Sequence, residues 1–262
     1  MEIEENCVSI LPDLQNNILK KIEISHNFSN DKTLPTFQSF VDTLLTSHSE
    51  SLKELSIPKY ECFNNTSNLL TVLKKLYFDE CSTKQVVEIF KLNRCPNLLE
   101  FEVYCLYDSA NDELSVDEGE ACVVPTLKRF KCKHYRGRDI HFTLKMFPGL
   151  RELELELGDD YLKFMEGLTN TYLPCLWKLD ITGSYFVKRN NMFDFGKAAR
   201  NFPKLEHLEV ANCFIEISDG GQQFDFPSLQ HVELTDVVID DNDVKILTAN
   251  LKRFVKIIEN PF

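Results

Sequence analysis

The chain has 262 residues, of which 43% are hydrophobic, so it is long enough to bury a sizeable core as one domain. Its formal net charge of −12 argues against a general nucleic-acid-binding protein, which needs a basic excess to neutralise phosphates, and favours a basic partner. The sequence has no apolar run of about 18 residues, the length that spans a bilayer, and its first residues lack the basic and apolar blocks of a signal peptide. Neither a membrane nor a nucleic acid is therefore expected as a partner.

The chain contains nine cysteines, an odd number. Cys81, Cys132 and Cys213 fall at interior positions of the repeat described below. This distribution predicts reduced, buried thiols, which are typical of a cytoplasmic or nuclear protein. On that prediction, the glycosylation triplets at Asn27, Asn64 and Asn65 are accidental.

A six-residue pattern with apolar residues at its first, fourth and sixth positions recurs along the chain. Between Phe202 and Cys213 it places Leu205, Leu208 and Val210 at offsets of zero, three and five, a spacing that suits neither a helix face nor simple alternation. Successive copies begin 33, 21, 25, 29, 23, 26, 29 and 24 residues apart. The nine copies begin at Leu19, Leu52, Leu73, Leu98, Leu127, Leu150, Leu176, Leu205 and Leu229.

The second half of the pattern predicts a short strand, because its two apolar side chains point one way and the residue between them points the other. The leading leucine turns into the same core from the approach to the strand. In six copies a proline stands two residues before that leucine, where it favours an extended backbone. The expected strands lie near residues 22–24, 55–57, 76–78, 101–103, 130–132, 153–155, 179–181, 208–210 and 232–234.

The pattern and its average period of about 26 residues resemble the leucine-rich-repeat superfamily over nearly the whole chain. The resemblance implies an α/β solenoid shaped like a horseshoe, with a curved parallel sheet on the concave face and irregular helices and loops on the convex face. It implies a single domain over residues 1–262, with an N-terminal extension at 1–10 and a C-terminal repeat or cap at 240–262. Asn27, Cys81 and Cys213 fit the N/C position of the superfamily's frame, whereas the other copies do not, so the repeats are irregular.

Amphipathic segments between the strands predict the helices of the convex layer. They are Thr36–Leu45, Thr83–Leu92, Tyr161–Leu168, Phe193–Arg200 and Asp241–Ala249. The acidic segment Asp108–Glu120 is either a solvated insertion or an acidic docking segment. Near the C-terminus, Leu251, Phe254 and Ile257 are compatible with a distorted tenth strand.

The sequence offers little chemistry, since no phosphate-binding, nucleotide-binding, metalloprotease or nucleophile motif occurs. The cluster Cys122, Cys132, His134 and His141 has a spacing that matches no zinc pattern. We therefore expect a protein that is not an enzyme, with no catalytic, cofactor or metal site.

The side chain between the two apolar strand residues should point into the hollow of the horseshoe. In order, these residues are Glu23, Ser56, Tyr77, Glu102, Lys131, Glu154, Asp180, Glu209 and Glu233. Stacked carboxylates on strands about 4.8 Å apart repel one another unless they are neutralised. Either Lys178, Arg151, His207 and His231 compensate them, or the charge is retained for a basic ligand.

A partner-binding surface on the concave face would comprise this column from Tyr77 onward and its neighbours. The candidate residues are Tyr77, Glu102, Lys131, Glu154, Trp177, Asp180, His207, Glu209, His231 and Glu233. Trp177, with Tyr77, Tyr104 and Tyr135, is a candidate aromatic anchor; alternatively, it packs against convex loops.

The irregular repeats with C-P-x-L or F-P-x-L openings resemble the substrate-recognition part of F-box proteins. The stretch LPDLQNNILKKI, Leu11 to Ile22, is similar to the F-box opening L-P-x-E-L-x-x-x-I-x-x-x-L, although it is one residue shorter. This resemblance implies a protein-interaction module, with Skp1 and a cullin ubiquitin ligase as possible partners. The alternative is an intracellular scaffold or a regulator of GTPases or the cytoskeleton. A GTPase activator would need a catalytic arginine, for which Arg136 and Arg138 are the candidates; otherwise these two residues form a basic turn.

Overall fold

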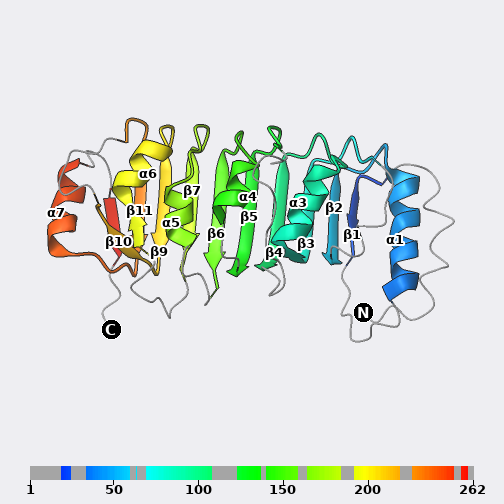
Figure 1. The fold of residues 1–262 in the computed structure, drawn as a ribbon, viewed down its shortest axis with the longest axis horizontal. Helices are drawn as coiled ribbons and strands as arrows, with labels where there is room; N and C mark the ends of the chain where they lie inside the picture. Colours follow the sequence, from blue (N-terminus) through cyan, green and yellow to red (C-terminus); the bar gives the residue numbers. More distant parts are fainter. Residues whose placement is uncertain are drawn as a thin grey trace.

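The protein is built around one sheet of ten strands in which all neighbouring strands are parallel (Figure 1). The computed structural model describes residues 19–24, 34–59, 63, 69–107, 123–136, 140–158, 164–183, 192–218, 226–250 and 255–258. In spatial order the strands are β1 (Lys21–Glu23), β2 (Glu54–Lys59), β3 (Lys75–Ser82), β4 (Glu100–Tyr107), β5 (Arg129–Arg136), β6 (Glu152–Leu157), β7 (Lys178–Thr182), β9 (His207–Ala211), β11 (His231–Thr235) and β12 (Val255–Ile258).

Equivalent residues of successive repeats pair with one another. Each of the first nine strands begins two residues after a leading leucine, and Leu179 of β7 pairs with Leu153 on one side and Leu208 on the other. The last strand, β12, continues the series, since Ile257 pairs with Leu234. Of the residues considered for a tenth strand, Leu251 and Phe254 lie outside the described residues. The parallel sheet predicted from the repeats is thus confirmed.

Short helices connect the strands, and Figure 1 shows α3 to α6 lying over the sheet, with α1 and α7 near its two ends. A second, two-stranded parallel sheet is formed by β8 and β10. The helices are α1 (Leu34–His48), α3 (Thr83–Lys91), α4 (Ile140–Lys145), α5 (Phe164–Thr169), α6 (Phe195–Asn201) and α7 (Asp241–Asn250), and the additional strands are β8 (Met192–Asp194) and β10 (Phe214–Glu216).

Two local predictions need correction. Phe193 and Asp194 belong to β8 and not to a helix, because they pair with β10 and because the Asp194 side chain caps α6 by accepting a hydrogen bond from the Lys197 N–H at 3.1 Å. Helix α4 is not predicted by the sequence pattern, because its buried positions Ile140, Thr143 and Leu144 include a polar residue and span little more than one turn. The acidic segment Asp108–Glu120 lies outside the described residues.

The start of α3 shows how the sequence changes from strand to helix within one residue. The side chain of Ser82 accepts a hydrogen bond from the Gln85 N–H at 3.2 Å, and the Gln85 side chain accepts one from the Ser82 N–H at 2.8 Å. This reciprocal capping box satisfies two donors that the first turn leaves unpaired. The strand can therefore end directly at the helix without a loop.

A row of phenylalanines joins consecutive repeats through the core. The ring of Phe101 in β4 lies 6.1 Å from Phe78 in β3 and stacks on Phe130 in β5 at 5.7 Å. Phe90 of α3 packs edge-on against Phe101 at 5.5 Å and against Phe147 at 5.3 Å. Since Phe90 comes from a helix, the face of the sheet that carries Phe101 is the one that the helices cover.

The N/C position of the repeat frame lies eight residues after the leading leucine, and it is buried in four of the six copies that the structure describes, whereas Gly158 and Val237 are partly exposed. Cys81, Leu106, Tyr135 and Cys213 are all buried there. Apolar bulk and a small thiol can both fill this space, which explains why the position is degenerate in sequence. The expectation that Cys81, Cys132 and Cys213 are buried is confirmed.

We predict that Phe101→Ala destabilises the protein by about 3–5 kcal/mol, because it removes a buried ring that contacts three others and leaves a cavity. Urea denaturation followed by circular dichroism measures the change in the free energy of unfolding. Lys133→Ala, at an exposed position of β5, is the control and should change that free energy by less than about 0.5 kcal/mol. Equal effects of the two substitutions would contradict the described core.

Candidate functional site

The face of the sheet opposite Phe101 is accessible and carries polar side chains. Strands such as β6 and β7 alternate buried leucine or isoleucine with partly exposed residues. Each member of the central column is partly or fully exposed. In register across the sheet the column is Glu23, Ser56, Tyr77, Glu102, Lys131, Glu154, Asp180, Glu209 and Glu233, and Lys256 of β12 follows Glu233.

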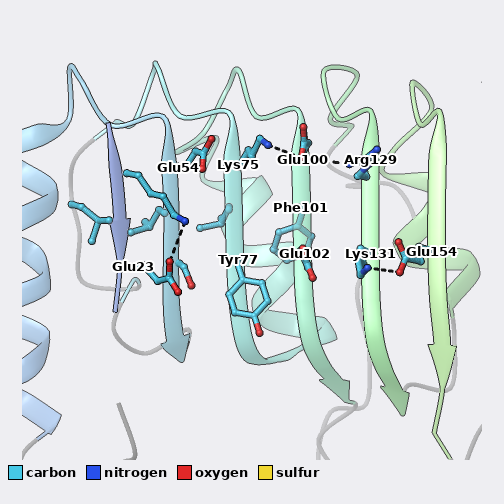
Figure 2. A pocket seen from close by; sticks show the side chains of 15 residues that line it. Glu23, Glu54, Lys75, Tyr77, Glu100, Phe101, Glu102, Arg129, Lys131 and Glu154 are labelled. Carbon is cyan, nitrogen blue, oxygen red and sulfur yellow. Dashed lines mark ion pairs between the residues drawn. The ribbon is translucent and has the colours of Figure 1, made fainter. Parts of the chain in front are cut away.

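The first half of this face is hollowed. A depression of about 420 Å³ extends from β1 to β6, and Figure 2 shows Tyr77 near its centre with Glu102 on the next strand. The Tyr77 hydroxyl donates a hydrogen bond to Asp79 Oδ1 at 2.9 Å. Burial, that hydrogen bond and the nearby carboxylates of Asp79 and Glu102 raise the pKa of Tyr77 above its ordinary value. The phenol therefore stays neutral and offers an aromatic surface in a charged setting.

Asp79 was not predicted as part of this site. It stands two residues after Tyr77 on the same strand, so alternation places both side chains on one face. That spacing could have identified it from the sequence.

The row of residues that begins each strand neutralises itself (Figure 2). Lys75 Nζ lies 3.3 Å from Glu100 Oε2, and Arg129 Nη1 lies 4.0 Å from the same oxygen. Arg129 also donates two hydrogen bonds to Glu152, one of them from Nε at 2.7 Å. Because cations and anions alternate along this row, it presents little net charge to a partner.

The central column is compensated only in part. Lys131 forms an ion pair with Glu154, Lys178 Nζ lies 4.0 Å from Glu209 Oε1, and His231 Nε2 lies 3.8 Å from Glu233 Oε2. These contacts involve two of the cations named as possible compensators. Arg151, another of the four residues named, forms no ion pair with any described residue.

Asp180 is the crowded carboxylate of the column. No cation of the described residues lies within ion-pair distance of it. Burial raises the pKa of Asp180, the carboxylates of Glu209 and Glu154 on the flanking strands raise it further, and Lys178 and Lys131 lower it. Negative charge is therefore left without a direct partner in the second half of the face.

An aromatic row borders this acidic half. The Trp177 ring packs edge-on against His207 at 5.5 Å, and His207 lies 5.9 Å from His231. The two histidines are at equivalent positions of adjacent strands, β9 and β11. Trp177 is half-buried. The three rings thus form a continuous edge beside the acidic residues.

The other two aromatic candidates, Tyr104 and Tyr135, differ in exposure. Tyr104 is 42% exposed, and its hydroxyl lies 3.1 Å from His134 Nε2. Tyr135 is wholly buried, so its proposed role as a surface anchor is wrong. The reason is its interior position in the repeat frame.

The zinc candidates are not gathered into one site. His134 contacts Tyr104, whereas His141 Nδ1 lies 2.6 Å from the Thr171 hydroxyl, and Cys122 lies outside the described residues. Burial raises the pKa of Cys132 to about 12, which keeps the thiol protonated. Within the described ranges, no group of three or more His, Cys, Asp or Glu side chains is placed to hold a metal ion.

The fold is similar to that of an internalin (inlF) from Listeria monocytogenes, with a TM-score of 0.56 and 15% sequence identity. The match covers 96% of this chain and 64% of the internalin, so this chain spans less than two thirds of that protein's length. At this identity the likeness concerns the fold alone, and it confirms the α/β leucine-rich-repeat solenoid. No protein-family model matches the chain, and no curated protein is similar to it in sequence.

None of the helices in the described part of the chain combines the length and the apolar character needed to cross a membrane.

We predict that Asp180→Asn stabilises the folded protein at neutral pH. The pKa of Asp180 is raised above the ordinary value of 3.8 in the folded state. As the pH rises from 3.8 to the folded-state pKa, ionisation of this side chain therefore lowers the stability of the folded protein, and above the folded-state pKa the loss is complete. The substituted amide carries no charge, so the melting temperature near pH 7 should rise by about 1–3 °C. The gain should vanish near pH 3, where the aspartate is protonated in both states.

Thermal melting monitored by circular dichroism at several pH values tests this prediction. Glu156→Gln, at an exposed position of β6, is the matched control and should change the melting temperature little at either pH. A gain from Asp180→Asn that persists unchanged in acid would show that its origin is not electrostatic.

Proposed function

We propose that the chain is a non-enzymatic protein-interaction module whose open sheet face binds a basic segment of a protein partner. The observation that carries this proposal is the register of Glu154, Asp180, Glu209 and Glu233 on four consecutive strands, with Asp180 lacking an ion pair to any described residue. The crowding of carboxylates costs stability in the free protein, and a cationic ligand would relieve it. Relief of the repulsion between these carboxylates would therefore contribute favourably to the free energy of partner binding.

The spacing of the column suits an extended peptide that crosses the strands. Four strands about 4.8 Å apart place the outer carboxylates roughly 14 Å from one another. Alternate side chains of an extended peptide are about 6.8 Å apart and face the same way. Three lysines or arginines at alternate positions would therefore cover the column from Glu154 to Glu233.

The aromatic row gives this site a second type of contact. Trp177 and His207 lie beside Asp180 and Glu209, because each precedes or begins the same strand. A guanidinium or ammonium group above the Trp177 ring would gain a cation–π contact of about 0.5–1 kcal/mol. Its aliphatic stem would cover the half-buried ring. Arginine is the better partner, because its planar group can stack and pair at once.

Tyr77, Glu102 and Lys131 extend the proposed surface into the hollow. Here charges of both signs are present, and the neutral phenol of Tyr77 lies between them. This half would accept a polar or aromatic part of the partner and would add shape selectivity. The basic segment itself would bind the acidic half.

Substrate recognition for a cullin-type ubiquitin ligase is one role that such a module could have in the cytoplasm or nucleus. The F-box-like opening from Leu11 to Ile22 supports this role, although residues 11–18 lie outside the described residues and Ile22 belongs to β1. The other role is an intracellular scaffold or a regulator of GTPases or the cytoskeleton; Arg136 ends β5, and Arg138 lies outside the described residues. Affinity capture of the intact protein distinguishes the roles, since recovery of Skp1 favours the ligase and a stable complex without Skp1 favours the scaffold.

We predict that the double substitution Asp180→Lys and Glu209→Lys weakens binding of a labelled lysine- and arginine-containing peptide by at least about tenfold, because two attractive contacts become repulsive. Fluorescence anisotropy at low ionic strength measures the affinity. Glu50→Lys with Glu166→Lys is the matched control, because both residues are exposed and lie away from the sheet face. This control changes the net charge equally and should alter the affinity by less than about twofold.

Because the double substitution removes the repulsion between carboxylates but also removes the ion pair of Lys178 with Glu209, thermal melting checks that the variant folds. If the variant folds and still binds the basic peptide as tightly as the wild type, the open face is not the binding site. If both double variants lose affinity equally, the attraction comes from the overall charge and not from the column.

A further inference from the structure

A row of basic side chains lies along the edge of the sheet at which the strands begin. These residues directly follow the leading leucines and directly precede the strands, so they are outside the two columns of the open face. The row reads Lys20, Lys53, Lys74, Leu99, Lys128, Arg151, Trp177, Glu206 and Gln230. Its first six members therefore comprise five cations and one leucine, in a protein whose net charge is −12.

Hydrogen bonds between repeats hold the row in register. The carbonyl oxygen of Lys53 accepts two backbone N–H groups from the next repeat, those of Lys74 at 2.8 Å and Lys75 at 3.0 Å. The carbonyl of Lys128 accepts the N–H groups of Arg151 and Glu152 at the same two distances. The same shared bond recurs at each step from Lys20 to Gln230. The spacing of the side chains along the edge is therefore that of the strands, about 4.8 Å per step.

The cations of this row are not neutralised within the described part of the chain. None of the five forms an ion pair with a described carboxylate, in contrast to Lys75 and Arg129 in the adjacent row. Lys20, Lys53 and Arg151 are exposed. Among the described residues, the ammonium groups of Lys74 and Lys128 bind only backbone carbonyls. Lys74 binds that of Asn97 at 3.3 Å, and Lys128 binds those of Pro125 at 3.0 Å and Gly149 at 3.4 Å. These bonds restrict the two side chains and leave their charge uncompensated.

We propose that this basic edge binds an acidic, extended polypeptide segment of a protein partner. The five cations extend over five strand spacings, about 24 Å, which matches seven or eight residues of extended chain. Carboxylates at alternate positions of such a segment would meet the row repeatedly. This surface is separate from the acidic column and attracts the opposite charge.

Two observations favour a polypeptide over a nucleic acid. Leu99, which is 38% exposed, stands in the middle of the row between Lys74 and Lys128, and Trp177 follows Arg151 at its end. An acidic peptide can place apolar side chains at both points, whereas a phosphate backbone gains nothing from the leucine. A polyphosphate also carries a charge on every unit and is repelled more strongly by an acidic protein.

The test uses the full chain and a labelled peptide of about 12 residues with glutamate at alternate positions, serine between them and one central leucine. We expect this peptide to bind in fluorescence anisotropy at low ionic strength, and we expect its glutamine counterpart to bind at least about tenfold more weakly. Lys53→Glu with Arg151→Glu should weaken binding of the glutamate peptide by at least about tenfold. The matched control is Lys145→Glu with Arg200→Glu, which exchanges one lysine and one arginine on exposed positions of α4 and α6 and should change the affinity by less than about twofold.

Melting curves check that the variants fold. If the Lys53→Glu with Arg151→Glu variant does not fold, Lys53→Gln with Arg151→Gln replaces it. This variant should weaken binding at least about threefold, because two contacts are lost. Unchanged affinity in the folded edge variant would overturn the proposal. Equal losses of affinity for the glutamate peptide in both double variants would also overturn the proposal, because the attraction would then come from the overall charge of the protein and not from this edge. Binding of a labelled oligothymidylate of equal length is measured as well. If it binds more tightly than the peptide and binds the edge variant more weakly than the wild type, the edge is a nucleic-acid surface. The peptide proposal would then be wrong.

Discussion

Every surface of this protein depends on the alignment of successive strands. The alignment is held on one side by apolar residues that fill the core at the same three positions of each repeat. Along the strand starts it is held by carbonyl groups that each accept two N–H groups from the next repeat. A residue's neighbours in space are therefore the residues with the same position in the adjacent repeats. Side chains far apart in the sequence, such as Glu154 and Glu233, thereby become part of one surface.

This alignment sorts charge into parallel rows of different character. The row that begins the strands, including Lys75, Glu100 and Arg129, alternates in sign and neutralises itself. On one side of it lies the central column, which contains four consecutive carboxylates, and on the other lies the row that contains Lys53 and Arg151. The neutral row keeps the acidic and the basic surfaces apart, so that each can attract a partner of its own without first binding the other.

The repeats predicted the sheet because their rule is local. Apolar residues at offsets of zero, three and five fix which side chains enter the core, whatever the length of the segment between two strands. Leu208 and Leu179 could therefore be assigned to the interior directly. The pattern predicts the helices less well, since α4 is a short helix whose buried residues include the polar Thr143 and since Phe193 extends a second sheet by pairing with Ile215, a residue of the following repeat. Tyr135 was misassigned because an interior position of the frame can hold a large ring as well as a small thiol.

The members of the central column could be named from the sequence, but their electrostatic balance could not. Whether Lys178 compensates Asp180 or Glu209 depends on side-chain geometry, and the ammonium group lies within ion-pair distance of Glu209 alone. The basic edge was overlooked for a different reason. Its residues stand one position before the strands, where alternation does not apply, so that only the carbonyl bonds between repeats reveal that they form a row.

The phenylalanine contacts across β3, β4 and β5 also bear on how the molecule comes apart. In a linear array each repeat is stabilised mainly by its two neighbours, and unfolding can begin at either end. Rings that interlock from Phe78 to Phe130, and through Phe90 to Phe147, make the coupling between the central repeats strong. The middle of the array should consequently resist amide exchange as one cooperative block, while opening events concentrate in the outer repeats.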